Sequence, residues 1–338
     1  MSGLRRHSRN PVLTRADIPK ITPFLDDVSS VFNPGAVRWN GWEEVGRRPT
    51  TGAGSSSVDR LLLRVQTRGR ETVLMVAESR DGESFTVLPE LVAIEGVDSL
   101  QPEPIHVYDP RVTVVDGRVV VVLSVDTRDG CFLLTTTWES DFRLRVVGWS
   151  PERASRNGVL FPERIAERYC RLERPNEKSL GSGVRTGDEI WFATSDDLVG
   201  WTLERPVLAG RWHYWDELIG SGPPPIKTHD GWLHVYHGVA THLGSGIYQA
   251  GVVLLDLEDP SRVLARGRNN ILEPRELYEM VGQVPNVVFP SGAIVETTDE
   301  DGFALPDSPV RIYYGAADTC VGLAETTIRE LLEASRLQ

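Results

Sequence analysis

Asp-Gly dipeptides recur along this chain between short runs of β-branched and other apolar residues. They occupy residues 81–82, 116–117, 129–130, 230–231 and 301–302. Asp-Gly between alternating apolar residues is the strongest short-range signal of a β-hairpin, because both residues tolerate the left-handed backbone of a tight turn. The sequence therefore predicts an all-β fold assembled from hairpins.

A second phrase repeats on a longer scale. A Ser, Thr or acidic residue is followed by an acid and then by an aromatic residue or leucine. The phrase is clear at residues 78–85, 138–142 and 195–201, and looser at 255–260 and 324–327. Successive copies lie roughly 55 to 70 residues apart, a period that in all-strand sequence is typical of propeller blades with enlarged loops. Five copies predict five blades, and residues 1–338 are expected to form a single β-propeller catalytic domain.

Three segments depart from this strand pattern. Residues 1–20 are expected to form an irregular N-terminal arm. Residues 41–59 are rich in Gly, Ser, Thr and Arg and are interpreted as an inserted, flexible surface loop. A short C-terminal helix is expected over residues 325–334, because Ile328 and Leu332 fall one helical turn apart.

Composition excludes several classes of function. The formal net charge of −12 argues against nucleic-acid binding, since a phosphate backbone would be repelled. No apolar run approaches transmembrane length, and the basic start is followed by no apolar segment, so we expect neither a membrane span nor a signal peptide. Cys131, Cys170 and Cys320 show neither zinc-site spacing nor a disulfide framework. A reducing, cytoplasmic location fits these features.

Cofactor signatures are missing as well. The sequence contains no Walker loop and no glycine-rich dinucleotide fingerprint. Its histidines include no HExxH pair, and His234 and His237 would face opposite sides of a strand. We therefore expect no metal and no organic cofactor.

One acid stands out at the start of a predicted hairpin. Asp109 lies between Tyr108 and Pro110, just before the strands that flank residues 116–117. The proline is expected to hold Asp109 in an extended conformation and so to aim its carboxylate. Taken alone, the ordinary interpretation is a turn acid before a hairpin.

Other polar residues end or interrupt apolar strands. Arg64 interrupts one strand, Arg156 and Asn157 precede another, His237 ends a third, and Asp318 closes the last predicted blade. Each has an ordinary structural interpretation: an ion-paired arginine, a loop, a packed histidine or a turn acid. In a propeller, however, such positions converge around the central channel. Acids and aromatic rings there would suit a sugar, and arginines with a histidine would suit a phosphate.

Taken together, these phrases resemble glycoside hydrolase family 130, the β-mannoside phosphorylases and their relatives. The resemblance extends from about residue 10 to residue 332. It rests on the stretches SVFNPGAV (30–37), LLLRV (61–65), DPRVT (109–113), RNGVLFPERI (156–165), IGSGPPPIKTHDGWLHVYHG (219–238), YEMVGQVPNVVFPSGAI (278–294) and IYYGAAD (312–318). Each stretch is weak alone, and their common order is a specific signal.

The resemblance implies a five-bladed propeller that cleaves β-mannosides with inorganic phosphate as co-substrate, inverting the anomeric centre to give α-mannose 1-phosphate. It implies Asp109 as general acid, passing its proton through a sugar hydroxyl. It places the mannose on Asn33 and Asp318, and phosphate on Arg64, Arg156, Asn157 and His237, with Arg68 or Arg70 as a further candidate. Phosphate already is an anionic nucleophile, so the second carboxylate that an inverting hydrolase needs is replaced by cations.

The chain also departs from the family. Tyr108 stands where the family usually has glutamate, and Leu218 where it has a phosphate-binding lysine. Residues 66–67 are Gln-Thr in place of an acidic pair. A charge-assisted contact contributes roughly 1.5 to 3 kcal/mol, so losing the lysine would weaken phosphate binding by about one to two decades. Lys227 is a candidate replacement.

Two other functions therefore remain open. One is a β-mannosidase that uses water, with Glu163, Asp216 or Glu217 as the base. The other is a propeller that binds glycans without turnover. The sequence does not distinguish a β-1,4 from a β-1,2 linkage or identify the acceptor sugar, mannose, glucose or GlcNAc. The resemblance also favours a homo-oligomer.

Overall fold

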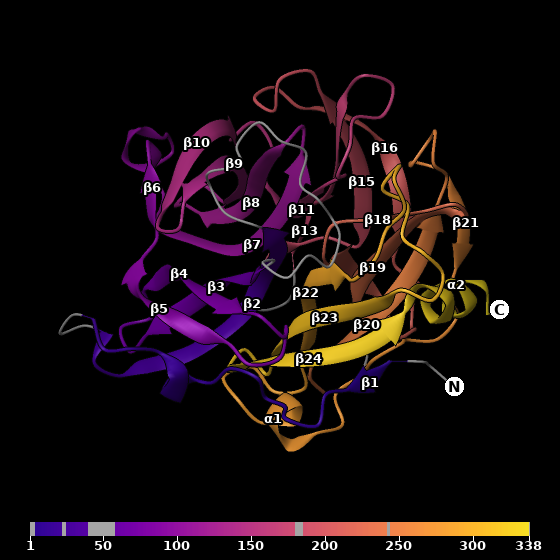
Figure 1. Cartoon of the computed structure of the whole chain (residues 1–338). Helices are drawn as coiled ribbons and strands as arrows, with labels where there is room; N and C mark the ends of the chain where they lie inside the picture. Colours follow the sequence, from indigo (N-terminus) through magenta and orange to yellow (C-terminus); the bar gives the residue numbers. More distant parts are fainter. Residues whose placement is uncertain (1–3, 22–24, 40–57, 180–184, 242–243, 338) are drawn as a thin grey trace.

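The computed structural model describes residues 4–21, 25–39, 58–179, 185–241 and 244–337. Its main strands form five sheets arranged around a common centre, where the first strands of neighbouring sheets pack together (Figure 1). The protein is a five-bladed β-propeller, as predicted.

The main strands of each blade are antiparallel and follow one another outward from the centre in chain order, and blades 2 and 5 each gain one outer strand from an earlier segment of the chain. Blade 1 contains β2 (Val28–Trp39), β3 (Val58–Thr67), β4 (Thr72–Ser79) and β5 (Thr86–Leu91). Blade 2 contains β7 (His106–Val115), β8 (Arg118–Asp126), β9 (Cys131–Ser140) and β10 (Arg143–Ser150), with β6 (Ala93–Glu95) parallel to β10. Blade 3 contains β11 (Ser155–Leu160), β12 (Tyr169–Pro175), β15 (Glu189–Ser195) and β16 (Thr202–Ala209).

In blade 4 the innermost position is divided between two short strands that both pair with the next one. Blade 4 contains β17 (Leu218–Ser221), β18 (Ile226–Thr228), β19 (Gly231–Ala240), β20 (Ile247–Leu255) and β21 (Val263–Arg266). Blade 5 contains β22 (Val288–Val295), β23 (Pro309–Ala316), β24 (Cys320–Thr327) and β1 (Arg5–Arg6). A separate ribbon joins β13 (Lys178–Ser179) and β14 (Arg185–Thr186).

The predicted hairpin at residues 116–117 is present between β7 and β8. Val115 pairs with Arg118, so the turn contains two residues. Asp116 has a φ angle of +50° and Gly117 of +71°. Left-handed backbone at both central residues matches the twist of the flanking strands.

The longer sequence repeat corresponds to the turn between the third and fourth strands of a blade. At the end of β15, the Ser195 Oγ accepts a hydrogen bond from the Leu198 amide (3.0 Å), and the Asp197 Oδ1 accepts one from the Val199 amide (2.9 Å). Serine and aspartate side chains commonly satisfy backbone donors in this way. The same arrangement ends β4, so the repeated phrase follows the third strand of these blades.

The N-terminal segment is more regular than expected. β1 pairs with β24, and a single 3-10 turn covers Arg15–Asp17. The Arg6 guanidinium donates two hydrogen bonds of 2.8 Å to Glu279, which lies within α1 (Leu277–Met280). The start of the chain thus supplies the outer strand of the last blade (Figure 1). A two-residue edge strand has no periodicity that a sequence could reveal.

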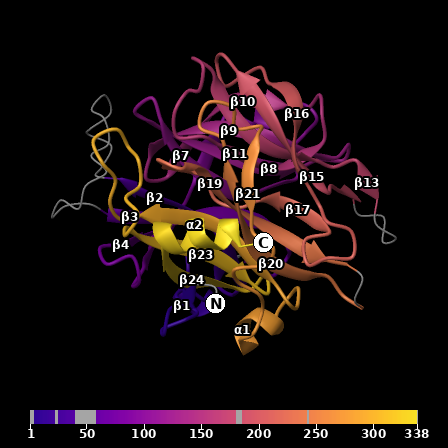
Figure 2. The ribbon, with the colours of Figure 1, turned by 90° about the vertical axis from the view of Figure 1, so that its right-hand side faces the viewer.

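The C-terminal helix α2 spans Ile328–Arg336, three residues later than expected at its start. β24 continues to Thr327, whose Oγ accepts from the Glu330 amide while the Glu330 carboxylate accepts from the Thr327 amide. This capping box fixes where the helix begins. The buried side of α2 packs on β20 and β24 (Figure 2).

The predicted loop at residues 41–59 falls largely outside the described residues. Only its last two residues, Val58 and Asp59, are described, and they already belong to β3.

Candidate active site

Three candidate residues occupy equivalent positions in three blades. Asn33, Asp109 and Asn157 lie in the innermost strands β2, β7 and β11, each where the pairing register with the second strand shifts. Their φ angles are +48°, +52° and +55°. Asparagine and aspartate tolerate this left-handed backbone better than most residues, and a bulge redirects the side chains next to it. The fold uses the same local device to present a polar side chain from each of these blades.

The prediction of an extended backbone at Asp109 is wrong. Pro110 disfavours the right-handed helical region for the preceding residue, and the bulge places Asp109 in the left-handed region instead. The buried Arg111 guanidinium stabilises this bulge from below. Its Nη1 donates to the main-chain oxygen of Asp109 (3.2 Å), and its Nε donates to the main-chain oxygen of Gly222 in blade 4 (2.7 Å).

The Asp109 carboxylate is held by two donors from blade 1. Its Oδ1 accepts hydrogen bonds from the Asn33 Nδ2 and the Arg64 Nη1, each at 2.9 Å, and its side chain is 10% exposed. Burial opposes ionisation of Asp109, but the positive charges of Arg64 and Arg111 and the Asn33 amide outweigh it and lower the pKa below its usual value. Asp109 is therefore a carboxylate in the ligand-free protein.

Aromatic rings fix the orientation of Arg64. Its guanidinium carbon lies 4.5 Å from the ring centroid of Phe32 and 4.4 Å from that of Tyr108. Such stacking favours a planar cation. Tyr108, which replaces the family's glutamate, therefore contributes a ring face to Arg64 and introduces no carboxylate there.

Asp318 behaves in the opposite way to Asp109. It lies in the turn between β23 and β24, and among the described residues its carboxylate has no hydrogen-bond or ion-pair partner. Burial raises the pKa of Asp318 to about 6. Arg64 opposes this rise, and the negative charge of Asp109 adds to it. Two acids, one from blade 2 and one from blade 5, thus differ in protonation: Asp109 is ionised, whereas the pKa of Asp318 is raised to about 6.

We expect Asp318→Asn to stabilise the protein at neutral pH. Ionising Asp318 costs more in the folded state, because its pKa of about 6 exceeds the usual value of 3.8. This cost is absent below pH 4 and grows to its full size as pH rises past 6. The variant should therefore gain about 3 kcal/mol in free energy of unfolding at pH 7 and nothing below pH 4. Urea unfolding at both pH values measures the gain, and a gain that does not vary with pH would contradict it.

Further polar candidate side chains gather on blades 3 and 4. Arg156 lies on β11, with its guanidinium carbon 5.8 Å from the Tyr108 ring. A Cβ atom on Gly220 would stand 2.4 Å from the His237 Cε1 and 2.6 Å from the Asn157 Oδ1. Only glycine lets these two side chains converge. Burial, then the charges of Arg174 and Arg111, keep the pKa of His237 well below its usual value, so the ring is a neutral hydrogen-bonding group.

Arg174 on β12 is a further candidate that the sequence motifs did not predict. This side chain is buried, and burial followed by the like charge of Arg156 lowers its pKa to about 10. Its Nη2 donates to the Asn176 Oδ1 (3.1 Å), its Nε has no hydrogen-bond partner, and no carboxylate among the described residues pairs with it. A buried cation without a counter-ion is costly unless an anion binds there. The available signal was the density of charged residues in an otherwise apolar strand, Tyr169–Pro175.

A cavity of about 420 Å³ lies beside Arg64, Tyr108 and Asp318. Its described lining residues are Phe32, Arg64, Gln66, Arg70, Thr72, His106, Tyr108, Asp126, Gln283, Val284 and Asp318. Asp109 and Arg156 lie behind this lining. Asp109 is hydrogen-bonded to Arg64, and Arg156 forms an ion pair with Asp126 (3.0 Å). The cavity thus combines aromatic rings, carboxylates and arginines, which suits a polar sugar beside an anion.

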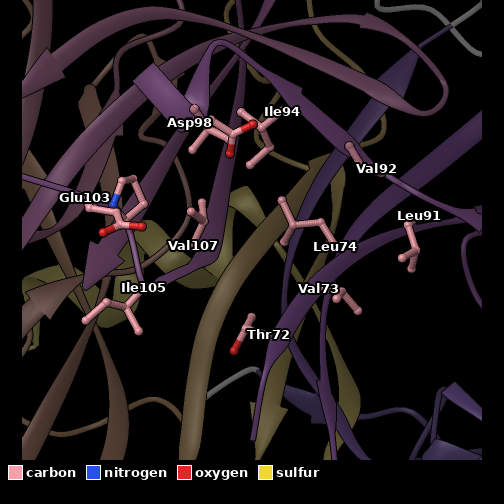
Figure 3. Close-up of a pocket in the computed structure, with 12 residues that line it drawn as sticks. Thr72, Val73, Leu74, Leu91, Val92, Ile94, Asp98, Glu103, Ile105 and Val107 are labelled. Atoms are coloured by element: carbon pink, nitrogen blue, oxygen red, sulfur yellow. The ribbon is translucent and has the colours of Figure 1, made fainter. Parts of the chain in front are cut away.

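A second cavity, of about 320 Å³, lies between blades 1 and 2 (Figure 3). Its described walls are mainly aliphatic, including Leu74 and Val107, with Asp98 and Glu103 as the only charged groups. It offers neither an aromatic ring nor a cation among these residues. It therefore lacks the groups that suit a sugar or a phosphate.

Several other residues raised by the sequence lie elsewhere. Lys227 donates to Glu163 (2.7 Å) and stacks over Phe303, so neither forms part of the site, and Lys227 does not replace the lysine missing at Leu218. Arg68 pairs with Asp27 at the surface (3.3 Å), whereas Arg70 lines the cavity.

The two remaining candidate bases for a water-using enzyme are also misplaced. Asp216 is fully buried between Arg211 and Arg266, and it also accepts a hydrogen bond from Tyr236. Glu217 accepts a hydrogen bond from Thr241 and does not line the cavity. The prediction that one of these acids or Glu163 serves as the base is therefore not supported by the geometry.

The described residues show neither a group of metal ligands nor a membrane-spanning helix. No three His, Cys, Asp or Glu side chains in that part of the chain are grouped so that they could hold a metal ion. No helix there is long and apolar enough to cross a membrane.

Comparison with known proteins identifies the family. The glycoside hydrolase 130 family, described as beta-1,4-mannooligosaccharide phosphorylase, matches residues 4–337. The chain is 30% identical to the 1,2-beta-oligomannan phosphorylase of Thermoanaerobacter sp. over 98% of its length and 99% of the relative's. It is 36% identical to a beta-1,2-mannobiose phosphorylase of the same strain over 73% of its length and 74% of the relative's.

The fold comparison agrees. The beta-1,2-mannobiose phosphorylase of Listeria innocua, solved with β-1,2-mannobiose, superposes with a TM-score of 0.76 at 27% identity, covering 98% of this chain and 99% of that one. The chain therefore belongs to glycoside hydrolase family 130, as its sequence motifs indicate.

Proposed function

We propose that this protein is an inverting phosphorylase that cleaves β-mannosides with inorganic phosphate and releases α-mannose 1-phosphate. One observation supports this most directly. The Asp109 carboxylate is hydrogen-bonded to Arg64, which lines a polar cavity, and Arg156 is ion-paired with Asp126, which lines the same cavity. Near Arg156 lies Arg174, a buried cation with no carboxylate partner among the described residues. Phosphorolysis needs one acid and an anion site, and this arrangement contains both.

Each residue receives a specific role. Asn33 and Asp318 bind mannose hydroxyl groups, and Arg64, Arg156, Asn157, Arg174 and His237 bind phosphate. An oxygen of the phosphate attacks C1 of the mannose from the face opposite the leaving group. The bond between C1 and the glycosidic oxygen breaks, and that oxygen takes the proton that Asp109 supplies through a mannose hydroxyl.

The protonation of Asp109 is linked to phosphate through Arg64. In the ligand-free protein Arg64 pairs with Asp109 and helps to keep the carboxyl ionised. A phosphate that shares the Arg64 guanidinium weakens that pairing, so the pKa of Asp109 rises toward the range of a proton donor. An acid with a lowered pKa in the free protein can therefore still serve in catalysis.

Phosphate is favoured over water as the nucleophile because the three acids first considered as bases all lie outside the cavity. The names of the relatives favour a β-1,2 linkage, since two of them at 30% and 36% identity act on 1,2-linked mannosides. A relative at 28% identity is a β-1,4-mannooligosaccharide phosphorylase, so a β-1,4 linkage is the second candidate. A cytoplasmic location and self-association stay predictions from the sequence.

Product analysis tests this function. The protein is incubated with β-1,2-mannobiose or β-1,4-mannobiose, with and without phosphate, and mannose and mannose 1-phosphate are quantified. We expect one equivalent each of mannose and α-mannose 1-phosphate, formed only with phosphate. Two equivalents of mannose regardless of phosphate would indicate a β-mannosidase. Binding of the disaccharide without either product would indicate a glycan-binding propeller.

A further inference from the structure

Asp126 is the one carboxylate lining the cavity to which the proposed mechanism gives no role. It is the last residue of β8, opposite His106 at the start of β7. Its side chain is 35% exposed. Its Oδ1 accepts two hydrogen bonds, from the Tyr108 hydroxyl at 2.8 Å and from the Arg156 Nη2 at 3.0 Å.

This geometry makes Asp126 a poor base or proton donor. Its Oδ1 already accepts hydrogen bonds from a cation and a phenol, so this oxygen is occupied and not directed at a substrate. The same geometry makes Asp126 a good counter-ion, since it occupies one of the hydrogen-bonding positions of the Arg156 fork. Tyr108 holds the carboxylate in this position, while its ring supports Arg64.

We propose that Asp126 is an internal competitor of phosphate that limits the affinity of the anion site. The inference rests on the proposed role of Arg156 as a phosphate ligand. The Arg156 Nη2 already donates to Asp126, so a phosphate that binds the other nitrogens of Arg156 would share one guanidinium group with the Asp126 carboxylate. The two like charges repel, so phosphate either tolerates Asp126 or displaces it from Arg156, and both cost affinity.

The same competition acts on the product. α-Mannose 1-phosphate carries its phosphate in the anion site after the reaction, and Asp126 can take Arg156 back as the product leaves. The Tyr108–Asp126–Arg156 cluster thus sets the balance between phosphate capture and product release. It adds a negative charge to a site from which, at Leu218, a family lysine is already missing.

The test compares two variants that alter one partner each. Asp126→Asn keeps the size of the side chain and removes its charge, and we expect the KM for phosphate to fall about tenfold while the KM for the mannoside changes less than twofold. Tyr108→Phe keeps the ring under Arg64 and the charge of Asp126, and we expect its KM for phosphate to stay level or to rise severalfold. Asp126→Ala serves as a second charge-removing variant.

A binding measurement accompanies the kinetics. Inorganic phosphate alone should raise the melting temperature at about tenfold lower concentration in Asp126→Asn than in the unmodified protein. An unchanged or raised phosphate constant in both charge-removing variants would overturn the counter-ion role, as would an equal fall in Tyr108→Phe. A parent protein that forms no product with phosphate would instead contradict the proposed function, which the product analysis detects separately.

Discussion

Asp109→Asn is expected to lower the turnover of β-linked mannobiose by about a thousandfold while the protein stays folded. The asparagine has the same shape and can still accept the hydrogen bonds from Asn33 and Arg64 that the carboxylate accepts now. It cannot supply a proton. The loss should therefore appear in kcat, with the KM for phosphate little changed, and circular dichroism and the melting temperature should confirm the fold.

A substrate that needs no proton separates catalysis from structure. With 2,4-dinitrophenyl β-mannoside the leaving group departs as a stable anion, so Asp109→Asn should retain most of the activity of the unmodified protein in the presence of phosphate. Asn33→Ala is the matched control, because it removes a mannose contact and a partner of Asp109 but leaves the acid, and it should impair both substrates alike. Near-normal turnover of mannobiose by Asp109→Asn would refute the assignment of the acid.

The fold could be predicted because its signals are local. The two-residue turn at Asp116 and Gly117 follows from backbone preferences alone. The turn at Ser195 and Asp197 recurs after β4, because serine and aspartate side chains satisfy the backbone donors of such a turn locally. The closure of blade 5 by β1 could not be predicted, because it pairs residues from opposite ends of the chain. The bulge at Asp109 was missed because a rule about Pro110 excludes one backbone region without selecting between the others.

The site was predictable to the extent that its residues interrupt a pattern. Arg64 and Asp109 break apolar strands or turns, and the structure joins them by a 2.9 Å hydrogen bond. Arg171 and Glu173, which precede Arg174 on the same strand, form an ion pair with each other. The sequence does not show which of the two arginines pairs with Glu173, so the missing counter-ion of Arg174 could not be predicted. Lys227 shows the converse error, since a lysine near a matched motif binds Glu163 instead.

Arg174→Met is expected to have opposite effects on phosphate use and on stability. Losing a charge-assisted contact of roughly 1.5 to 3 kcal/mol should raise the KM for phosphate by about 10- to 100-fold. At the same time, an apolar side chain of similar length removes a buried guanidinium that lacks a carboxylate partner among the described residues and lies near Arg156. The free energy of unfolding without phosphate should therefore rise by about 1 to 3 kcal/mol.

The matched control lies three residues earlier on the same strand. Arg171 is also fully buried, but its Nε donates to the Glu173 carboxylate at 2.8 Å. Arg171→Met leaves Glu173 with Arg153 as its remaining charged partner, so it should destabilise the fold by about 3 kcal/mol or more. If Arg174→Met also destabilised the protein and left the phosphate constant unchanged, Arg174 would be a structural residue. The expected contrast in sign arises because one buried arginine has its anion within the fold, whereas the other receives its anion only when phosphate binds.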